Sequence, residues 1–180
     1  LAVKPWIVGG VMDEIKPFLL PNHVVASMVG GMGIDDLDAM VGGNTPVYCL
    51  IPNTAIAVRQ SMTFVCAKNT TAEQDELLLA ILREQGDAMF VRPDQLAGGT
   101  ALASCGIAYA MRYLRAATEG GVQLGFYAHD AQRIVMQTMK GMVALLEQTG
   151  GHPEAEIDRV TTPGGITIRG LNAMERAGFT

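Results

Sequence analysis

The feature that most constrains this chain is an apolar segment in its second half. Residues 98–114, GGTALASCGIAYAMRYL, carry no charged side chain before Arg112. A helix that is apolar on several faces must be enclosed by protein. We expect a second subunit to enclose it, in an interlocked helical dimer, and the alternative is burial within the core of one subunit. Small residues would let neighbouring backbones approach closely, and these are Gly99, Ala101, Ala103, Ser104, Gly106 and Ala108.

The second half of the chain is predicted to be helical around this segment. Residues 96–121 and 128–151 are long stretches rich in alanine, methionine and leucine. Each ends in a glycine pair, which is a common helix stop. Cys105 lies on the first of these helices, where we expect it to be a small core residue.

The first half of the chain contains short apolar stretches that we predict to be strands. Residues 23–30 and 45–52 are rich in β-branched side chains and are bounded by Gly, Pro and Asn, as buried parallel strands are. Residues 60–68 have the pattern of a third strand. Residues 87–93, which end at Pro93, are predicted to form an edge strand.

Helical patterns lie before and between these strands. Apolar residues recur at intervals of three and four in residues 8–20, 33–43 and 71–86. The last of these starts with Thr71 as N-cap and Gln74 three residues later, a capping-box arrangement, and is expected to end at Gly86. The order of elements predicts an α/β domain at residues 1–93, followed by a helical domain at residues 94–180.

Composition excludes several classes of function. Hydrophobic residues make up 49% of the 180 residues, and the net charge is −5 with no long run of one sign, so no nucleic-acid or membrane partner is expected. Cys49, Cys66 and Cys105 show no CxxC spacing, so neither a metal site nor a disulfide framework is indicated. No apolar run is long enough to span a bilayer and no signal pattern starts the chain, so we expect a cytoplasmic protein.

A polar loop precedes the last predicted helix. Pro163 fixes its own backbone and favours an extended Thr162, while Gly164 and Gly165 lack the Cβ atoms that would keep a ligand from the main chain. Helical spacing follows at Ile168, Leu171, Met174 and Ala177. The free N–H groups of the first helical turn, with the threonine hydroxyls, would form an anion site for a carboxylate or phosphate. The alternative is an ordinary capped turn.

Several motifs resemble one enzyme family. Residues 152–179, HPEAEIDRVTTPGGITIRGLNAMERAGF, resemble the carboxyl-terminal signature of pyrroline-5-carboxylate reductases, a His-Pro followed by V-[TS]-S-P-G-G-x-T-I-x-x-L-x-x-L-E-x-x-G-F. LAVKP resembles the family's Ala-Val-Lys-Pro after a Rossmann strand, and LIPNTAIAVRQSMT its Met-Pro-Asn-Thr-Pro loop. TALASCGIAYAMRYLRAATEGGVQLG resembles its Leu-Ser-Gly-Ser-Gly-Pro-Ala-Tyr helix, so the resemblance covers essentially the whole chain.

The resemblance implies a fold and a reaction. The fold is part of a Rossmann-like dinucleotide-binding domain followed by an all-α dimerisation domain. The reaction is hydride transfer from NADPH or NADH to the imine carbon of 1-pyrroline-5-carboxylate, which gives L-proline in the last step of its biosynthesis without a metal. The implied assembly is a homodimer, and some family members form rings of dimers. Family members also carry a glycine-rich G-x-G-x-x-[AG] turn ahead of the point where this sequence begins, so we expect that this chain is seen without that segment.

The resemblance also implies roles for individual residues. Thr167 corresponds to the family threonine that hydrogen-bonds the substrate near its ring nitrogen, and is the catalytic candidate. The loop that receives the substrate carboxylate corresponds to Thr162, Gly164, Gly165 and Ile166. The implied cofactor residues are Ala2, Val3, Lys4 and Pro5 beside the ribose and diphosphate, Met28, Val29 and Gly30 in the turn after the next strand, and Asn53 near the nicotinamide. Without the resemblance, Val3 and Val29 could equally be core residues of a strand, and Asn53 could equally be an ordinary turn residue.

The chain departs from the family at the start of the apolar helix. Ala103 and Cys105 replace two serines of the family motif and Ile107 replaces its proline, which predicts a straighter and less polar helix start. Two alternatives to the family reaction are open. One is reduction of a different small cyclic imine, and the other is a non-catalytic or truncated relative that acts as a dimerisation module.

Overall fold

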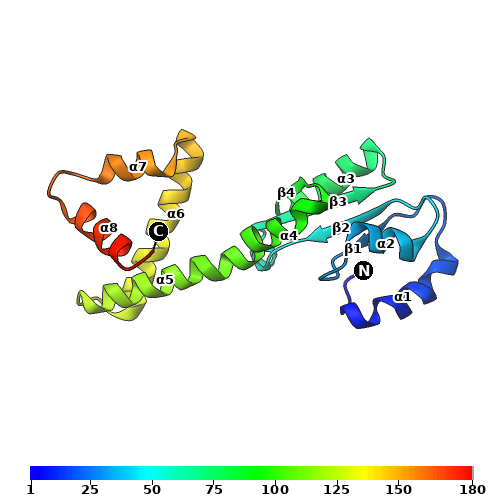
Figure 1. The fold of residues 1–180 in the computed structure, drawn as a ribbon, viewed down its shortest axis with the longest axis horizontal. Coiled ribbons are helices and arrows are strands. Elements are labelled where there is room, and N and C mark those ends of the chain that lie inside the picture. Colours follow the sequence, from blue (N-terminus) through cyan, green and yellow to red (C-terminus); the bar gives the residue numbers. More distant parts are fainter. Residues whose placement is uncertain (180) are drawn as a thin grey trace. The chain divides into compact units, whose positions relative to one another are not determined.

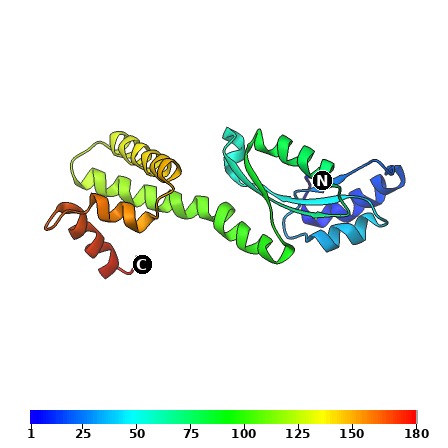
Figure 2. The ribbon, with the colours of Figure 1, turned by 90° about the horizontal axis from the view of Figure 1, so that it is seen from above.

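The computed structural model describes residues 1–179, which fall into two compact units divided between Met111 and Arg112. The first unit contains a sheet with helices, and the described residues of the second unit form helices and loops only (Figure 1, Figure 2). The predicted order, an α/β part followed by a helical part, is confirmed. Helix α5 (Gly106–Gln123) contains the division between the units.

The first unit is built on a four-stranded sheet in the order β1-β2-β3-β4. The strands are β1 (Val25–Ser27), β2 (Val47–Ile51), β3 (Ser61–Lys68) and β4 (Gly86–Phe90). β1 and β2 are parallel, as predicted, β2 and β3 are antiparallel, and β3 and β4 are parallel. All four strands lie where the sequence patterns predicted them, and β4 stands at an edge of the order as expected.

The first residues of the chain lie along the free edge of β1. The Leu1 amino group donates to the Ala26 carbonyl oxygen, and the Met28 N–H donates to the Leu1 carbonyl oxygen at 2.8 Å. This alternation of donor and acceptor is the pattern of a parallel ladder. Leu1 and Val3 also pack against the core, so residues 2–5 follow a strand-like segment beside β1.

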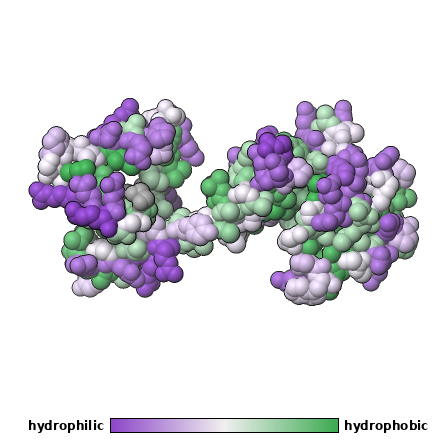
Figure 3. All heavy atoms as spheres, in the orientation of Figure 1, coloured by the Kyte–Doolittle hydropathy of each residue, from purple (hydrophilic) through white to green (hydrophobic). Residues whose placement is uncertain are grey.

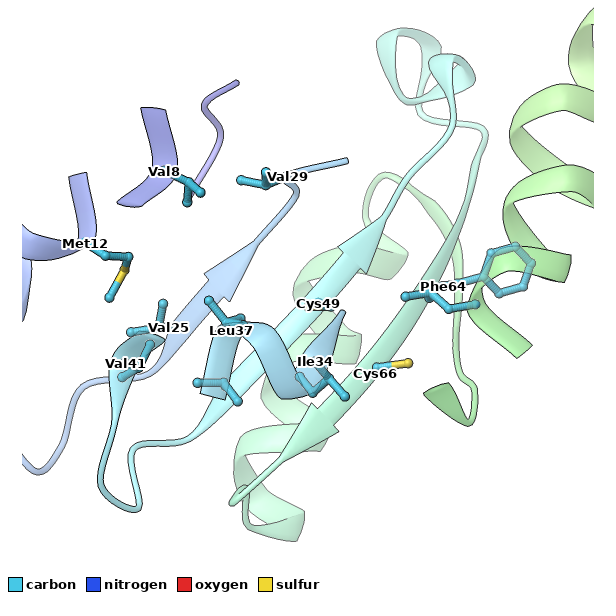
Figure 4. Packing of buried hydrophobic residues seen from close by; sticks show 12 residues of the cluster. Val8, Met12, Val25, Val29, Ile34, Leu37, Val41, Cys49, Phe64 and Cys66 are labelled. Carbon is cyan, nitrogen blue, oxygen red and sulfur yellow. The ribbon is translucent and has the colours of Figure 1, made fainter. Parts of the chain in front are cut away.

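Helices cover both faces of the sheet. α1 (Val8–Ile15) and α2 (Ile34–Val41) pack on the face that carries Cys49 and Cys66 (Figure 4). α3 (Ala72–Arg83) packs its Leu78 and Leu82 on the opposite face, against Tyr48, Leu50 and Val65. Because β2 is buried on both faces, four of its five residues are buried, as its continuous apolar sequence predicted.

The capping box of α3 is confirmed, but its predicted end is wrong. The Thr71 hydroxyl accepts the Gln74 N–H at 3.3 Å, and the Gln74 side chain accepts the Thr71 N–H at 2.9 Å. The helix ends at Arg83, and Gly86 instead begins β4 with φ +135°. A Cβ on Gly86 would lie 2.2 Å from the Ser61 carbonyl oxygen, so this glycine permits close strand pairing and does not stop the helix.

The helix predicted over residues 96–121 is less regular and longer than expected. It comprises α4 (Leu96–Gly99), a π-helical segment (Thr100–Cys105) and α5. The π-helical segment lies at the helix start that was predicted to be straighter and less polar than the family's, and that comparison stays a prediction. α5 also continues past the glycine pair, because Gly121 packs against α6: a Cβ there would lie 2.8 Å from the Ala131 Cβ.

Three further helices complete the second unit. They are α6 (Ala128–Thr149), α7 (Pro153–Val160) and α8 (Ile166–Arg176). The end of α6 is as predicted, with Gly150 as C-cap at φ +61°. Among residues 1–179, no helix combines the length and apolarity that crossing a bilayer requires.

Large apolar side chains remain exposed on the long helices, in part visible as green patches in Figure 3. In α6 they are Ile134, Met136, Met142, Val143 and Leu145, and α6 buries only Ala131 among its residues. Cys105 is exposed, so its predicted place in the core is wrong. Within each unit, these surfaces lack the cover that an apolar helix requires.

Candidate functional site

One group of predicted site residues lies at a single edge of the sheet. Because β1 and β2 are parallel, their carboxyl ends point to the same edge. Residues 28–30 directly follow β1, and Asn53 follows β2 after Pro52. Open α/β sheets bind ligands in the crevice outside the carboxyl ends of their strands.

A cavity of about 510 Å³ opens at the β1 side of this edge. It is lined by Pro5, Val8, Val29, Gly30, Gly31, Met32, Asp36, Ala39 and Met40. Three predicted cofactor residues, Pro5, Val29 and Gly30, are thus brought together. Gly31 has φ +79°, and no heavy atom lies within 4 Å of the position its Cβ would take, so the main chain of this turn is open to a ligand.

Four further predicted cofactor residues lie near the start of the chain or directly after β1: Ala2, Val3, Lys4 and Met28. Ala2, Lys4 and Met28 are exposed, with Met28 fixed beside the first residue by its N–H bond to the Leu1 carbonyl oxygen. Val29 is 6% exposed and belongs to the core as well as to the cavity wall. Val3 packs against the same core.

Ser27 holds the turn after β1 and was not singled out by the sequence analysis. Its buried Oγ accepts the Val29 N–H at 3.2 Å, and its hydroxyl donates to the Met32 Sδ at 3.7 Å. The available signal was a lone serine within an otherwise apolar strand. Such a buried hydroxyl requires a partner, and here the partners are the backbone and side chain of the turn.

Asn53 is buried and bound within the protein. Its Oδ1 accepts the Ala55 N–H at 3.0 Å, which caps the 3₁₀ turn Thr54–Val58, and its Nδ2 donates to the Ala103 carbonyl oxygen at 3.5 Å. Asn53 does not line the cavity beside β1. It lines a second, polar cavity of about 430 Å³ with Arg59, Gln60, Ser61, Met62, Arg83, Gly86 and Asp87.

The second group of predicted residues forms a tight turn in the second unit. The Gly165 N–H donates to the Thr162 carbonyl oxygen at 2.9 Å, and Gly164 has φ +70°. Proline followed by a glycine of positive φ is the arrangement of a type II turn. A Cβ on Gly165 would lie 2.5 Å from Thr162 Oγ1, so both glycines are required by the geometry.

This turn leads directly into α8. Gly165 is its N-cap and has no side chain, so the N-cap residue provides no side-chain hydrogen bond to the N–H groups of the first turn. A glycine N-cap is also common at ordinary helix starts, so both the anion site and the ordinary capped turn stay predictions. Ile166 and Thr167 are exposed on this turn, while the predicted stripe of Ile168, Leu171 and Met174 is half-buried. Ala177 is exposed.

The chemistry of an anion site follows from this geometry. Free backbone N–H groups and the positive end of the helix dipole favour a carboxylate or phosphate. The Thr161 hydroxyl is used within α7, where it donates to the Ile157 carbonyl oxygen at 2.7 Å. The exposed Thr162 and Thr167 carry the hydroxyls closest in sequence to the start of α8.

Other reactive side chains are unsuited to a site. Cys49 and Cys66 face each other across β2 and β3 and are buried. Burial raises the pKa of the Cys49 thiol to about 11 and also raises the pKa of Cys66, so neither forms a thiolate readily. Residues 1–179 contain no cluster of His, Cys, Asp and Glu that would hold a metal ion.

Comparison with known proteins gives consistent matches along the chain. Residues 93–180 match the family model for pyrroline-5-carboxylate reductase dimerisation. The chain is 40% identical to pyrroline-5-carboxylate reductase 1 of Dictyostelium discoideum and 36% identical to pyrroline-5-carboxylate reductase 2 of that organism, over its whole length. It spans 35% and 65% of these two relatives, respectively.

Solved structures show the same relationship. A crystal structure of Plasmodium falciparum pyrroline carboxylate reductase with NADP bound matches 98% of this chain at 29% identity and a TM-score of 0.89, over 71% of its own length. A pyrroline-5-carboxylate reductase from Coxiella burnetii matches 99% of the chain at 27% identity and a TM-score of 0.92, over 67% of its own length. By sequence and by fold, this chain belongs to the pyrroline-5-carboxylate reductase family.

Proposed function

We propose that the protein is an NADPH- or NADH-dependent reductase that converts 1-pyrroline-5-carboxylate to L-proline in proline biosynthesis. The observation that carries this proposal is the uncapped start of α8 behind the turn Thr162–Gly165. A cyclic imino acid has one carboxylate, and this turn offers free N–H groups to one anion. The relatives named as pyrroline-5-carboxylate reductases support this choice of substrate over other anions.

The second-unit residues would hold the substrate by its two polar ends. Thr162, Gly164, Gly165 and Ile166 form the segment that would receive the carboxylate. Thr167, exposed on the first turn of α8, would hydrogen-bond the substrate near its ring nitrogen, where charge changes as the imine is reduced. A donor fixed at that atom stabilises the transition state more than the ground state.

The first-unit residues fit a dinucleotide. The cavity beside β1 lies at the carboxyl edge of parallel strands, and the open main chain at Gly31 permits the close approach that a diphosphate needs. Pro5, Val29 and Gly30 would line it, with Ala2, Val3, Lys4 and Met28 around it, and Asn53 would hold the adjoining loop. When bound, the nicotinamide supplies the hydride.

A homodimer is part of the proposal. The exposed apolar side chains of α5 and α6 need a protein partner, and residues 93–180 match a dimerisation family. A second copy of the chain provides a partner with the same apolar face, as in other two-fold symmetric assemblies.

Steady-state rates test the substrate assignment. NADPH and NADH oxidation would be followed with 1-pyrroline-5-carboxylate for the full-length protein and for Thr167→Ala. We expect kcat/KM to fall at least about tenfold in Thr167→Ala, a loss of roughly 1.4 kcal/mol of transition-state stabilisation. The matched control is Thr161→Val, since that hydroxyl bonds only within α7, and it should keep the wild-type rate. Absence of turnover by folded, dimeric wild-type protein would refute the proposal and favour a different cyclic imine or a non-catalytic role.

A further inference from the structure

The loop after β2 is tied to its surroundings by a buried polar network. The Asn53 N–H donates to Ser61 Oγ at 3.2 Å, and Ser61 Oγ lies 3.1 Å from Thr63 Oγ1. Asn53 is 9% exposed, Ser61 3% and Thr63 1%. We call these three residues the Asn53 network.

The network also reaches the π-helical segment. Asn53 Nδ2 donates to the carbonyl oxygen of Ala103, which lies within Thr100–Cys105. π-Helical turns displace carbonyl groups from regular pairing and are frequent at functional sites. One residue thus ties the loop after β2 to the helix that follows β4.

A second contact fixes this helix against the sheet. A Cβ on Gly99 would lie 2.8 Å from the Phe64 ring, so α4 approaches β3 as closely as a glycine allows. Phe64 follows Thr63 in the strand, and both Phe64 and the half-buried Ala103 belong to the same apolar core. The helix therefore has little freedom to move away from the network.

We infer that the Asn53 network is a positioning device, in which Ser61 and Thr63 set the loop after β2 against the π-helical segment and thereby fix the geometry of the reductive step. The inference rests on the proposed function, because it assigns the loop to the nicotinamide end of the cofactor site. None of the three side chains needs to touch a ligand. Both polar ends of Asn53 have protein partners, and Ser61 and Thr63 are almost fully buried.

The physical reason is the cost of an unpaired buried donor. Without the Ser61 hydroxyl, the buried Asn53 N–H loses its partner, which destabilises the loop unless it shifts toward water. A fully satisfied polar network specifies one geometry, whereas a half-satisfied one does not. A shift of the loop would misplace the reactants and lower kcat more than substrate affinity.

Kinetics of four variants of the full-length protein test the inference. Ser61→Ala and Thr63→Val remove hydroxyls from the network, and Thr63→Ser keeps one. Tyr48→Phe removes a buried hydroxyl that bonds Asp75 of α3 and no residue of the network. We expect kcat to fall about tenfold in Ser61→Ala and less in Thr63→Val, with KM for the imine unchanged. Thr63→Ser should restore kcat, and Tyr48→Phe should keep it despite a similar loss of thermal stability.

Hydrogen exchange provides a readout that does not depend on turnover. In Ser61→Ala, amide exchange should accelerate in residues 53–58 and 100–105 and stay unchanged in α3. Wild-type kcat in both Ser61→Ala and Thr63→Val, or unchanged exchange in residues 53–58, would overturn the inference. If the wild-type protein has no turnover, the proposed function fails. The exchange result then decides by itself whether the network holds the loop in place.

Discussion

At the scale of single residues, Gly165 shows how a backbone position can decide ligand binding. In Gly165→Ala the new Cβ would meet Thr162 Oγ1 at 2.5 Å and the Thr162 carbonyl oxygen at 3.0 Å, so the turn must open. We expect KM for 1-pyrroline-5-carboxylate to rise about tenfold or more, as the loss of roughly 1.4 kcal/mol of binding would give. Steady-state kinetics with the imine as varied substrate measure this.

Gly170→Ala is the control for this change. It lies in the same helix, and no heavy atom lies within 4 Å of its Cβ position. We expect an unchanged KM and a gain of about 0.5–1 kcal/mol in stability, because alanine loses less conformational entropy than glycine in a helix interior. Equal KM values for the two variants would show that the turn does not bind the substrate.

Site residues could be predicted from the sequence where their contacts are with adjacent residues, and not where the contacts are with distant ones. The turn Thr162–Gly165 and the start of α8 are determined by adjacent residues, so proline and glycine chemistry predicted them. Ser61 and Thr63, by contrast, have partners that are distant in sequence: the loop at Asn53 lies eight or more residues away, and the helix that Asn53 contacts lies about 40 residues away. These segments come together only through the pairing of the strands. A hydroxyl within an apolar strand was the one available signal, and it does not identify a partner.

At the scale of elements, Gly121 is needed for close helix packing and does not end its helix. A Cβ there would lie 2.8 Å from the Cβ of Ala131, which is 2% exposed, so Gly121→Ala would force α5 and α6 apart. We expect destabilisation of about 1–3 kcal/mol, typical of overpacking. Gly120→Ala, with no heavy atom within 4 Å of its Cβ position, should instead stabilise the protein slightly. Urea unfolding of both variants tests the contrast, and two equally stable variants would contradict the close contact.

Sequence patterns predicted some elements well and others poorly, and glycines account for part of this difference. Strand positions and the capping box of α3 follow from local periodicity and side-chain hydrogen bonding, and both are confirmed. Gly86 and the pair at 120–121 were interpreted as helix stops, because a sequence does not distinguish a glycine needed for φ from one needed for close approach. The π-helical segment was not predicted either: it lies next to the contact of Gly99 with Phe64 and accepts a hydrogen bond from Asn53 at Ala103, and local sequence patterns reveal neither partner.

At the scale of the whole molecule, an apolar helix that lacks cover within its own unit demands a partner. The first segment considered, residues 98–114, is almost uncharged, yet Leu102, Tyr109 and Met111 are each more than 60% exposed. The second unit has the same imbalance on α6, whose single buried residue is Ala131. Composition could predict that a partner is needed, and it could not predict which side chains the partner covers, because that depends on the fold of each unit.

A charge placed on the apolar face of α6 should therefore weaken self-association. Met142 is 51% exposed and lines an apolar groove of about 380 Å³ between α6 and α7, with Leu145, Ile157 and Val160. In Met142→Glu the free subunit should lose little stability, because this side chain is already exposed to water. A dimer that covers this face would have to bury an unpaired carboxylate, at a cost of several kcal/mol. We expect the dimer dissociation constant to rise at least about tenfold by analytical ultracentrifugation, with reductase activity falling at the dilutions where subunits separate.

Gln148→Glu adds the same charge at a polar position of α6 and should dissociate as the wild type does. Unchanged dissociation in Met142→Glu would place the partner on another face.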